Sequence, residues 1–388
     1  MKIGIDIRVL MDKNYSGISE YTANLLSEIL EQDRNNEYKL FYNSFKTPED
    51  RLGSWVKNNS KLIATHYPNK VFNYFLQKIC SRPKLDKILG ETDIFFAPHL
   101  NFLNVSGKTK LIVTVHDLSF LRYPEFFSFR KNIWHKALNI KKLLHQAEMI
   151  VAVSENTKLD LIELIGMASE KIRVIYSGNN CKASIINSEL VDNFLNQRFL
   201  KKNFILSVGN IEPRKNVSGL IAAYNELRNK RPDINNQLVL AGAKGWKHRK
   251  IFNTWRQSPY QADIKFLGYI SRLEKEILYS NASIFVYPSF YEGFGFPPLE
   301  AMAFGLPVVS SNVSSLPEVL GKAALLVNPF KSEAIAEAME IALTNEDIRS
   351  DLIKKGKERA ANFTWEKSAQ EYLKLFSEIN EKSKDKFK

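Results

Sequence analysis

The sequence predicts an α/β protein made of two doubly wound, Rossmann-like domains. Short apolar runs, typical of buried strands, alternate with helical patterns along the whole chain, as they do in parallel sheets covered by helices. A length of 388 residues exceeds what one ordinary hydrophobic core serves, so we expect two domains. No apolar run approaches the ~20 residues that a membrane-spanning helix needs.

The first half of the chain predicts one complete sheet. A helix is expected near residues 19–31, and Ser154 is a candidate N-cap for a later helix because its hydroxyl can accept a backbone N–H. A polar, weakly patterned stretch at 181–202 is the expected linker, which makes residues 1–180 the first domain. Strands are expected at 2–7, 94–97, 111–115, 149–153 and 171–176.

The second half predicts a second sheet of the same kind. Its domain runs over residues 203–365, with a helix near 217–229 after the first strand. A long amphipathic helix is expected at 364–380. Strands are expected at 203–208, 237–241, 264–266, 282–286, 307–310 and 323–327.

The most informative segment follows the predicted strand 282–286. It holds two carboxylates, Glu292 and Glu300, with seven residues between them and a glycine-bearing turn at 293–295. A Pro-Pro pair at 297–298 suits the first turn of a helix, where a missing N–H costs little, and we expect Glu300 in that turn. Backbone N–H groups at such a helix N-terminus form a ready site for phosphate.

Two other segments place polar side chains after a predicted strand. Arg214 and Lys215 follow strand 203–208 and precede a helix, where two adjacent cations can clamp a diphosphate. We expect the loop that carries them to be exposed. His116 follows strand 111–115 directly, so its side chain is expected at the carboxyl edge of the sheet, beyond which ligands bind in open α/β proteins.

Three further positions give weaker signals. Gly17 opens a helix and could let a phosphate or an acceptor approach the backbone, but one glycine does not match the GxGxxG fingerprint of dinucleotide binding. Arg8 is as compatible with a surface position as with a place near a ligand. Ser315 and Glu318 have the spacing of a capping box.

Taken together, these motifs resemble the retaining nucleotide-sugar glycosyltransferases of family 4, which have the GT-B fold of two Rossmann-like domains facing a cleft. The family's Glu-x7-Glu motif matches Glu292 and Glu300, and the flanking residues agree as well. Many relatives carry an Arg where this chain has Asn210, and Arg214 could take its share. The resemblance also implies that the last helix, with residues 366–388, crosses back onto the first domain.

The resemblance implies a role for each candidate residue. Glu292 would bind hydroxyls of the transferred hexose, His116 would contact the same sugar, and Glu300 would accept hydrogen bonds from the ribose hydroxyls. Arg214 and Lys215 would neutralise the leaving diphosphate, which makes them, with Glu292 and His116, the catalytic candidates. Further donor-binding candidates are Gly17, Tyr269, Gly293, Phe294 and Gly295.

The implied reaction is the transfer of a hexose with retention of configuration. Similar bacterial mannosyltransferases assemble surface polysaccharide such as lipopolysaccharide, so GDP-mannose is the first candidate among nucleoside diphosphate hexoses. The implied acceptor is a saccharide or a lipid-linked oligosaccharide. No cofactor and no metal is expected, because the chain has no Asp-x-Asp pair and its histidines lack metal-ligand spacing. An epimerase or phosphorylase of the same architecture and a non-catalytic membrane-surface subunit remain alternatives.

The net charge of +13 is concentrated between Lys57 and Lys142, with 15 Lys or Arg against 5 Asp or Glu. Residues 123–145 mix these cations with aromatic residues, which suits an anionic membrane surface and equally an amphipathic helix whose apolar face is core. Nucleic acid is not expected, because no binding motif accompanies the charge. Two distant cysteines, Cys80 and Cys181, fit a reducing cytoplasm, with the enzyme either free or peripheral on the inner face of the membrane.

Overall fold

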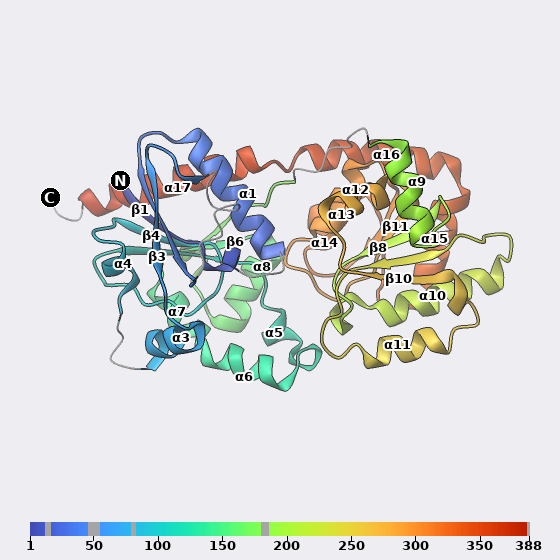
Figure 1. The fold of residues 1–388 in the computed structure, drawn as a ribbon, viewed down its shortest axis with the longest axis horizontal. Helices are drawn as coiled ribbons and strands as arrows, with labels where there is room; N and C mark the ends of the chain where they lie inside the picture. Colours follow the sequence, from blue (N-terminus) through green and yellow to red (C-terminus); the bar gives the residue numbers. More distant parts are fainter. Residues whose placement is uncertain (12–16, 46–54, 79–82, 180–185, 386–388) are drawn as a thin grey trace. The chain divides into compact units, whose positions relative to one another are not determined.

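The chain folds into two compact units, each built around one parallel sheet (Figure 1). The first unit combines residues 1–118, 130–178 and 364–388, and the second combines residues 119–129 and 179–363. The predicted fold class of two Rossmann-like units is confirmed. The computed structural model describes residues 1–11, 17–45, 55–78, 83–179 and 186–385; Cys80, Cys181 and residues 181–185 of the predicted linker lie outside these ranges.

The units differ from the predicted domains in two places. Residues 119–129 lie within the predicted first domain, yet they group with the second unit. One reason is that the Trp246 indole N–H donates a hydrogen bond to the Phe126 carbonyl oxygen at 2.5 Å. The predicted linker at 181–202 contains a helix, α9 (Ser188–Gln197), which belongs to the second unit.

The first sheet has the strand order β3-β2-β1-β4-β5-β6-β7, with every neighbouring pair parallel. The order reverses between β1 and β4, where Ile3 lies opposite both Tyr38 and Ile94. The inner strands read as near-continuous apolar runs because helices cover both faces. The strands are β1 (Lys2–Asp6), β2 (Glu37–Asn43), β3 (Ser60–Thr65), β4 (Ile94–Ala97), β5 (Lys110–Val115), β6 (Met149–Ala152) and β7 (Ile172–Val174).

Helix α17 (Trp365–Asp385), at the C-terminal end of the described chain, packs on α1 (Gly17–Gln32) within the first unit, which confirms the expected return to this unit. The hydroxyls of Tyr21 and Tyr372 lie 2.7 Å apart, and Trp365 is buried against Tyr21. Ser154 is the predicted N-cap, since its Oγ accepts the Thr157 N–H. The other helices of this half are α3 (Asn69–Lys78), α4 (Leu85–Ile88), α6 (Phe129–Ala137), α7 (Ile140–Gln146) and α8 (Glu155–Asp160).

The second sheet has the parallel order β10-β9-β8-β11-β12-β13, which reverses between β8 and β11. Its strands are β8 (Phe204–Val208), β9 (Leu238–Ala241), β10 (Ile264–Gly268), β11 (Ala282–Tyr287), β12 (Val308–Ser311) and β13 (Leu325–Val327). The other helices of this unit are α5 (Ser119–Arg122), α10 (Val217–Lys230), α11 (Arg249–Arg256), α12 (Arg272–Asn281), α13 (Phe296–Ala303), α14 (Leu316–Leu320), α15 (Ser332–Thr344) and α16 (Glu346–Ala361).

Candidate active site

Two loops meet at the point where the order of the second sheet reverses. The loop after β8 carries Arg214 and Lys215 on a short 3-10 turn, and the loop after β11 carries Glu292. Because β8 and β11 are adjacent and parallel, side chains beyond their carboxyl ends lie close together. The structure therefore brings together three of the four predicted catalytic residues.

Glu292 lies at the centre of this cluster and is only 7% exposed. One carboxylate oxygen, Oε1, accepts from Lys215 Nζ at 2.6 Å, and the other, Oε2, accepts from Arg214 Nη1 at 2.9 Å. The hydroxyls of Tyr287 and Ser289 also donate to Oε1, at 3.0 and 2.5 Å. The carboxylate is thus held in one orientation from several sides.

The charges around Glu292 keep it ionised. Burial raises the pKa of Glu292, but the charges of Arg214 and Lys215 and the hydrogen bonds outweigh it and lower this pKa to about 2. Glu212 binds the Arg214 guanidinium at 3.1 Å, so two carboxylates balance two cations. A diphosphate would therefore share both cations with carboxylates that are already in place.

The prediction that the loop carrying Lys215 is exposed is wrong. The Lys215 side chain is 13% exposed, and its ammonium lies 4.9 Å from the centre of the Tyr287 ring. The aliphatic stem of Lys215 lies beside Gly209, the residue that directly follows β8. The carboxylate of Glu292 draws the ammonium inward, which residue spacing alone does not reveal.

The turn between Glu292 and α13 is fixed by two serines from the loop after β12. The Glu292 N–H donates to Ser314 Oγ at 2.9 Å, and Ser315 Oγ donates to the carbonyl oxygens of Glu292 and Phe294. Ser315 forms no side-chain cap, so the predicted capping box is wrong: its hydroxyl holds this turn instead. Gly295 adopts φ of +101° at the N-cap of α13, a conformation that favours glycine. Residues 293–295 are buried within the described chain.

Glu300 belongs to a second cluster, built with α12. Its Oε1 accepts from Lys275 Nζ at 2.7 Å and its Oε2 accepts from the Tyr279 hydroxyl at 2.8 Å. Sequence reasoning missed both partners, although their spacing of four places them on one face of a helix. Glu300 lies in the second turn of α13, not in the first, because the helix begins at Phe296.

His116 follows β5 directly, as predicted, and belongs to the first unit. Its Nε2 lies 2.8 Å from the Pro98 carbonyl oxygen, which can only accept, so Nε2 carries the proton and Nδ1 is left as an acceptor in the neutral ring. The ring meets Tyr21 edge-on at 4.5 Å. Burial lowers the pKa of His116 from its ordinary value of 6.5, although the hydrogen bond to Pro98 opposes this.

Arg8 is buried rather than at the surface. Its guanidinium binds Asp6, at the end of β1, with Nη2 and Oδ2 2.6 Å apart, and it donates to the Phe102 carbonyl oxygen at 3.0 Å. His99, just after β4, is also buried, and burial lowers its pKa to about 4. Asp6 ends β1 and His99 follows β4, the two strands at which the first sheet reverses its order, a position that sequence reasoning did not assign to them.

Two predicted donor-binding residues, Tyr269 and Gly17, have few close neighbours among the described residues. Tyr269 directly follows β10 and is 57% exposed. Gly17 begins α1, and among the described residues no atom outside its own stretch of chain lies within 4 Å of the place where a Cβ would stand. A side chain at Gly17 would therefore meet no steric obstacle within the described residues.

Comparisons with known proteins agree with this geometry. Residues 15–182 match the family described as Glycosyltransferase Family 4, and residues 192–359 match the family described as Glycosyl transferases group 1. Together these two matches span most of the chain, and the predicted resemblance to the family 4 glycosyltransferases is confirmed. It is 27% identical over 370 residues to O-antigen chain mannosyltransferase B of Escherichia coli, a match that covers 93% of this chain and 96% of that protein.

Two solved structures show that the fold is GT-B. Sucrose-phosphate synthase from Thermosynechococcus elongatus superposes with a TM-score of 0.75 at 20% identity, covering 97% of this chain and 98% of that one. HepE from Anabaena, in complex with UDP-glucose, superposes with a TM-score of 0.74 at 17% identity, covering 97% of this chain and 100% of that one.

Within the described ranges, no helix is long and apolar enough to cross a membrane. The same residues contain no group of three or more His, Cys, Asp or Glu side chains that could hold a metal ion.

Proposed function

We propose that this glycosyltransferase transfers a hexose, with retention of configuration and without a metal ion, from a nucleoside diphosphate sugar to a saccharide. The buried Glu292 carboxylate, held between Lys215 and Arg214 where the sheet reverses, carries this proposal. Mannose is the first candidate sugar, supported by the mannosyltransferase named above. A lipid-linked acceptor in surface polysaccharide assembly fits the same relative.

The cluster explains how the donor would react. Arg214 and Lys215, with the amides of residues 293–295, would stabilise negative charge on the departing diphosphate, the task that a metal performs elsewhere. Glu292 would accept hydrogen bonds from hexose hydroxyls and stabilise positive charge at the anomeric carbon. As the bond to the phosphate oxygen breaks, the acceptor hydroxyl forms its bond on the same face, and a phosphate oxygen takes the hydroxyl proton.

The remaining residues would bind and orient the donor. Lys275 and Tyr279 hold Glu300 in place, so that its carboxylate can accept from the ribose hydroxyls. Tyr269 follows β10 at the carboxyl edge of the second sheet, where its backbone would contact the base. Nδ1 of the neutral His116 ring is a hydrogen-bond acceptor that suits a sugar hydroxyl.

A panel of nucleoside diphosphates and their sugars, added without metal and with a chelator, tests the donor assignment by thermal unfolding. A ligand that binds only the folded state raises Tm by mass action. We expect GDP and GDP-mannose to give the largest rise. A larger rise of Tm with UDP or dTDP compounds would replace guanine and mannose as the assigned base and sugar. No rise with any nucleotide would overturn the proposal.

The low pKa of His116 predicts a flat pH profile near neutrality. Protonation at Nδ1 would remove the acceptor, and because burial lowers this pKa, activity should fall only below pH 6.5. The measurement is kcat/KM against pH for wild type and His116→Asn. The variant should lose roughly tenfold or more in kcat/KM and lack the acid limb. An acid limb that persists in the variant would assign the titration to another group.

We further propose that the enzyme is peripheral on the inner face of the membrane. Helix α6 contains no buried residue and exposes Phe129, Ile133 and Trp134, by 80%, 51% and 42%. Arg130 and Lys136 lie on the same helix. An apolar face that is exposed rather than core, beside cations, supports binding to an anionic lipid surface.

Sedimentation with vesicles tests this location. The doubly substituted variant Phe129→Ser, Trp134→Ser should lose most binding to vesicles containing phosphatidylglycerol, whereas neutral vesicles should bind wild type weakly at the same ionic strength. Phe199→Ser is the matched control, because Phe199 is also 80% exposed but lies outside α6. Equal binding by the double variant and wild type would contradict a role for α6.

A further inference from the structure

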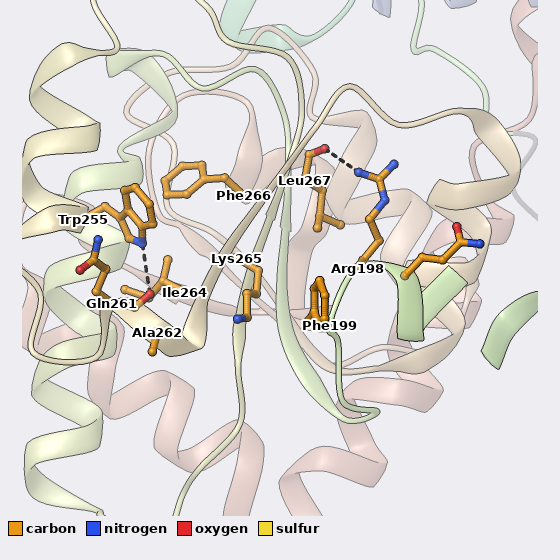
Figure 2. Close-up of a pocket in the computed structure, with 10 residues that line it drawn as sticks. Arg198, Phe199, Trp255, Gln261, Ala262, Ile264, Lys265, Phe266 and Leu267 are labelled. Carbon is orange, nitrogen blue, oxygen red and sulfur yellow. Dashed lines mark hydrogen bonds between the residues drawn. The ribbon is translucent and has the colours of Figure 1, made fainter. Parts of the chain in front are cut away.

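A pocket of about 540 Å³ lies beside β10, the edge strand of the second sheet, and shares no residue with the clusters of Glu292 and Glu300 (Figure 2). Its volume falls within the range of about 300–1,000 Å³ that is usual for small-molecule sites. Three aromatic residues, two amides and two cations line it, with no carboxylate among the lining residues. They are Phe199, Trp255, Phe266, Gln197, Gln261, Arg198 and Lys265.

Phe199 is the residue that the fold does not explain. It follows α9 in a Schellman motif, in which the Phe199 N–H donates to Asn196 and the Leu200 N–H donates to Leu195. The motif requires a left-handed residue, and Phe199 has φ of +54°, where glycine is the residue of least strain. Its side chain is 80% exposed, so packing within the chain does not compensate for this strain.

The side chains of the other two aromatic residues of the pocket, Trp255 and Phe266, are held in place by contacts within this unit. The Trp255 indole N–H donates to the Gln261 carbonyl oxygen at 3.3 Å, and its ring meets Phe266 edge-on at 5.5 Å. Both rings also pack against the core of this unit. The pocket therefore offers preorganised aromatic surface, which binds a ligand without a large ordering cost.

The polar groups of the pocket require an amphipathic ligand. Arg198 is engaged by the Leu267 carbonyl oxygen and by Glu274, as Figure 2 shows for Leu267. The Lys265 ammonium makes no hydrogen bond or ion pair with the described residues, and Figure 2 draws this side chain between Trp255 and Phe199. A purely apolar partner would bury this ammonium and the amide groups without hydrogen bonds, at a high cost.

We propose that this pocket is a second saccharide site, which holds a segment of the polysaccharide away from its reacting end. A hexose ring presents C–H groups on its faces and hydroxyls around its edge; the former suit the electron-rich faces of Phe199 and Trp255, and the latter suit Lys265 and the amides. The inference rests on the proposed saccharide acceptor. A second contact raises the effective concentration of a long acceptor at the active site.

Phe199→Gly is the informative variant, because glycine relieves the left-handed strain and should leave Tm equal to or above that of wild type. The probes are short linear oligosaccharides of mannose, glucose and galactose, with binding measured by calorimetry. At least one should bind wild type, and the variant should bind it roughly tenfold more weakly. Leu190→Ser, an exposed position on α9 outside the pocket, should bind as wild type does.

Kinetics separate this site from the active site. With long acceptors, Phe199→Gly should raise KM for the acceptor and leave kcat unchanged, whereas with short acceptors both should match wild type. Binding of none of the probes by wild type, or equal binding by Phe199→Gly, would overturn the inference. So would a dimer in sedimentation that Phe199→Gly converts to monomer, since a second copy would then cover the pocket. If nucleotides fail to shift Tm while oligosaccharides still bind through Phe199, the proposed function fails and this site stands.

Discussion

Glu292→Gln should reduce kcat for sugar transfer by roughly 10²–10³-fold, the usual effect of removing one preorganised electrostatic group. The amide keeps the shape of the Glu292 side chain but carries no negative charge to stabilise the anomeric centre. It also removes the charge that binds Lys215 and Arg214, whose nitrogens lie 2.6 and 2.9 Å from the two carboxylate oxygens of Glu292. Single-turnover kinetics at saturating donor measures the effect on the chemical step. Glu340→Gln, which removes a carboxylate that binds Arg231 and Lys230 outside this cluster, is the control and should retain wild-type kcat.

The same substitution should change the response to acid. A carboxylate whose pKa is lower in the folded state stabilises the fold above its ordinary pKa of 4.5, and this stability is lost as pH falls towards the folded pKa of about 2. The shift corresponds to about 3 kcal/mol. Glu292→Gln should therefore be less stable at pH 7 and lose less stability than wild type between pH 5 and 2. Urea unfolding at several pH values measures both slopes, and parallel slopes would show that folding does not lower the pKa of Glu292.

Most of the strands that could be predicted are short, largely apolar runs. Strand β4 was predicted with its observed bounds, whereas β2 and β3 were missed. In β2, Lys39 interrupts the apolar pattern, yet it is buried because its ammonium donates to the Glu91 carbonyl oxygen at 2.7 Å. Such a contact joins residues far apart in sequence, and no local pattern records it.

The candidate site divides in the same way. Arg214, Lys215 and Glu292 could be predicted together because each lies beyond the carboxyl end of a strand, and parallel strands bring these ends to one edge. Their pairing could not, because it depends on which side chains turn inward once Tyr287 and Ser289 are in place. The partners of Glu300, Lys275 and Tyr279, were missed for a similar reason. Their contact depends on how α12 lies beside α13, which the sequence does not specify.

Lys215→Met is expected to lower kcat/KM for the donor by roughly 10²–10³-fold, because the ammonium would stabilise the departing diphosphate. Methionine keeps most of the stem that lies beside Gly209, so the change removes the charge rather than the packing. The fold should also lose about 1–3 kcal/mol, since Glu292 then keeps Arg214 and two hydroxyls but no ammonium. Lys230→Met, at an exposed ion pair, is the control for general loss of charge and should cost at most about 1 kcal/mol.

The loss of stability must be separated from the loss of donor binding, because both follow from one ammonium. The rise in Tm that a nucleoside diphosphate causes, taken relative to the unliganded protein of the same variant, isolates binding from stability. Lys215→Met should show a much smaller rise than wild type, and Lys215→Arg should recover part of it, since a guanidinium can reach both a carboxylate and a phosphate. An undiminished rise in Lys215→Met, together with the expected drop in unliganded Tm, would leave Lys215 as a structural partner of Glu292 and assign the diphosphate to Arg214 and the amides of the turn.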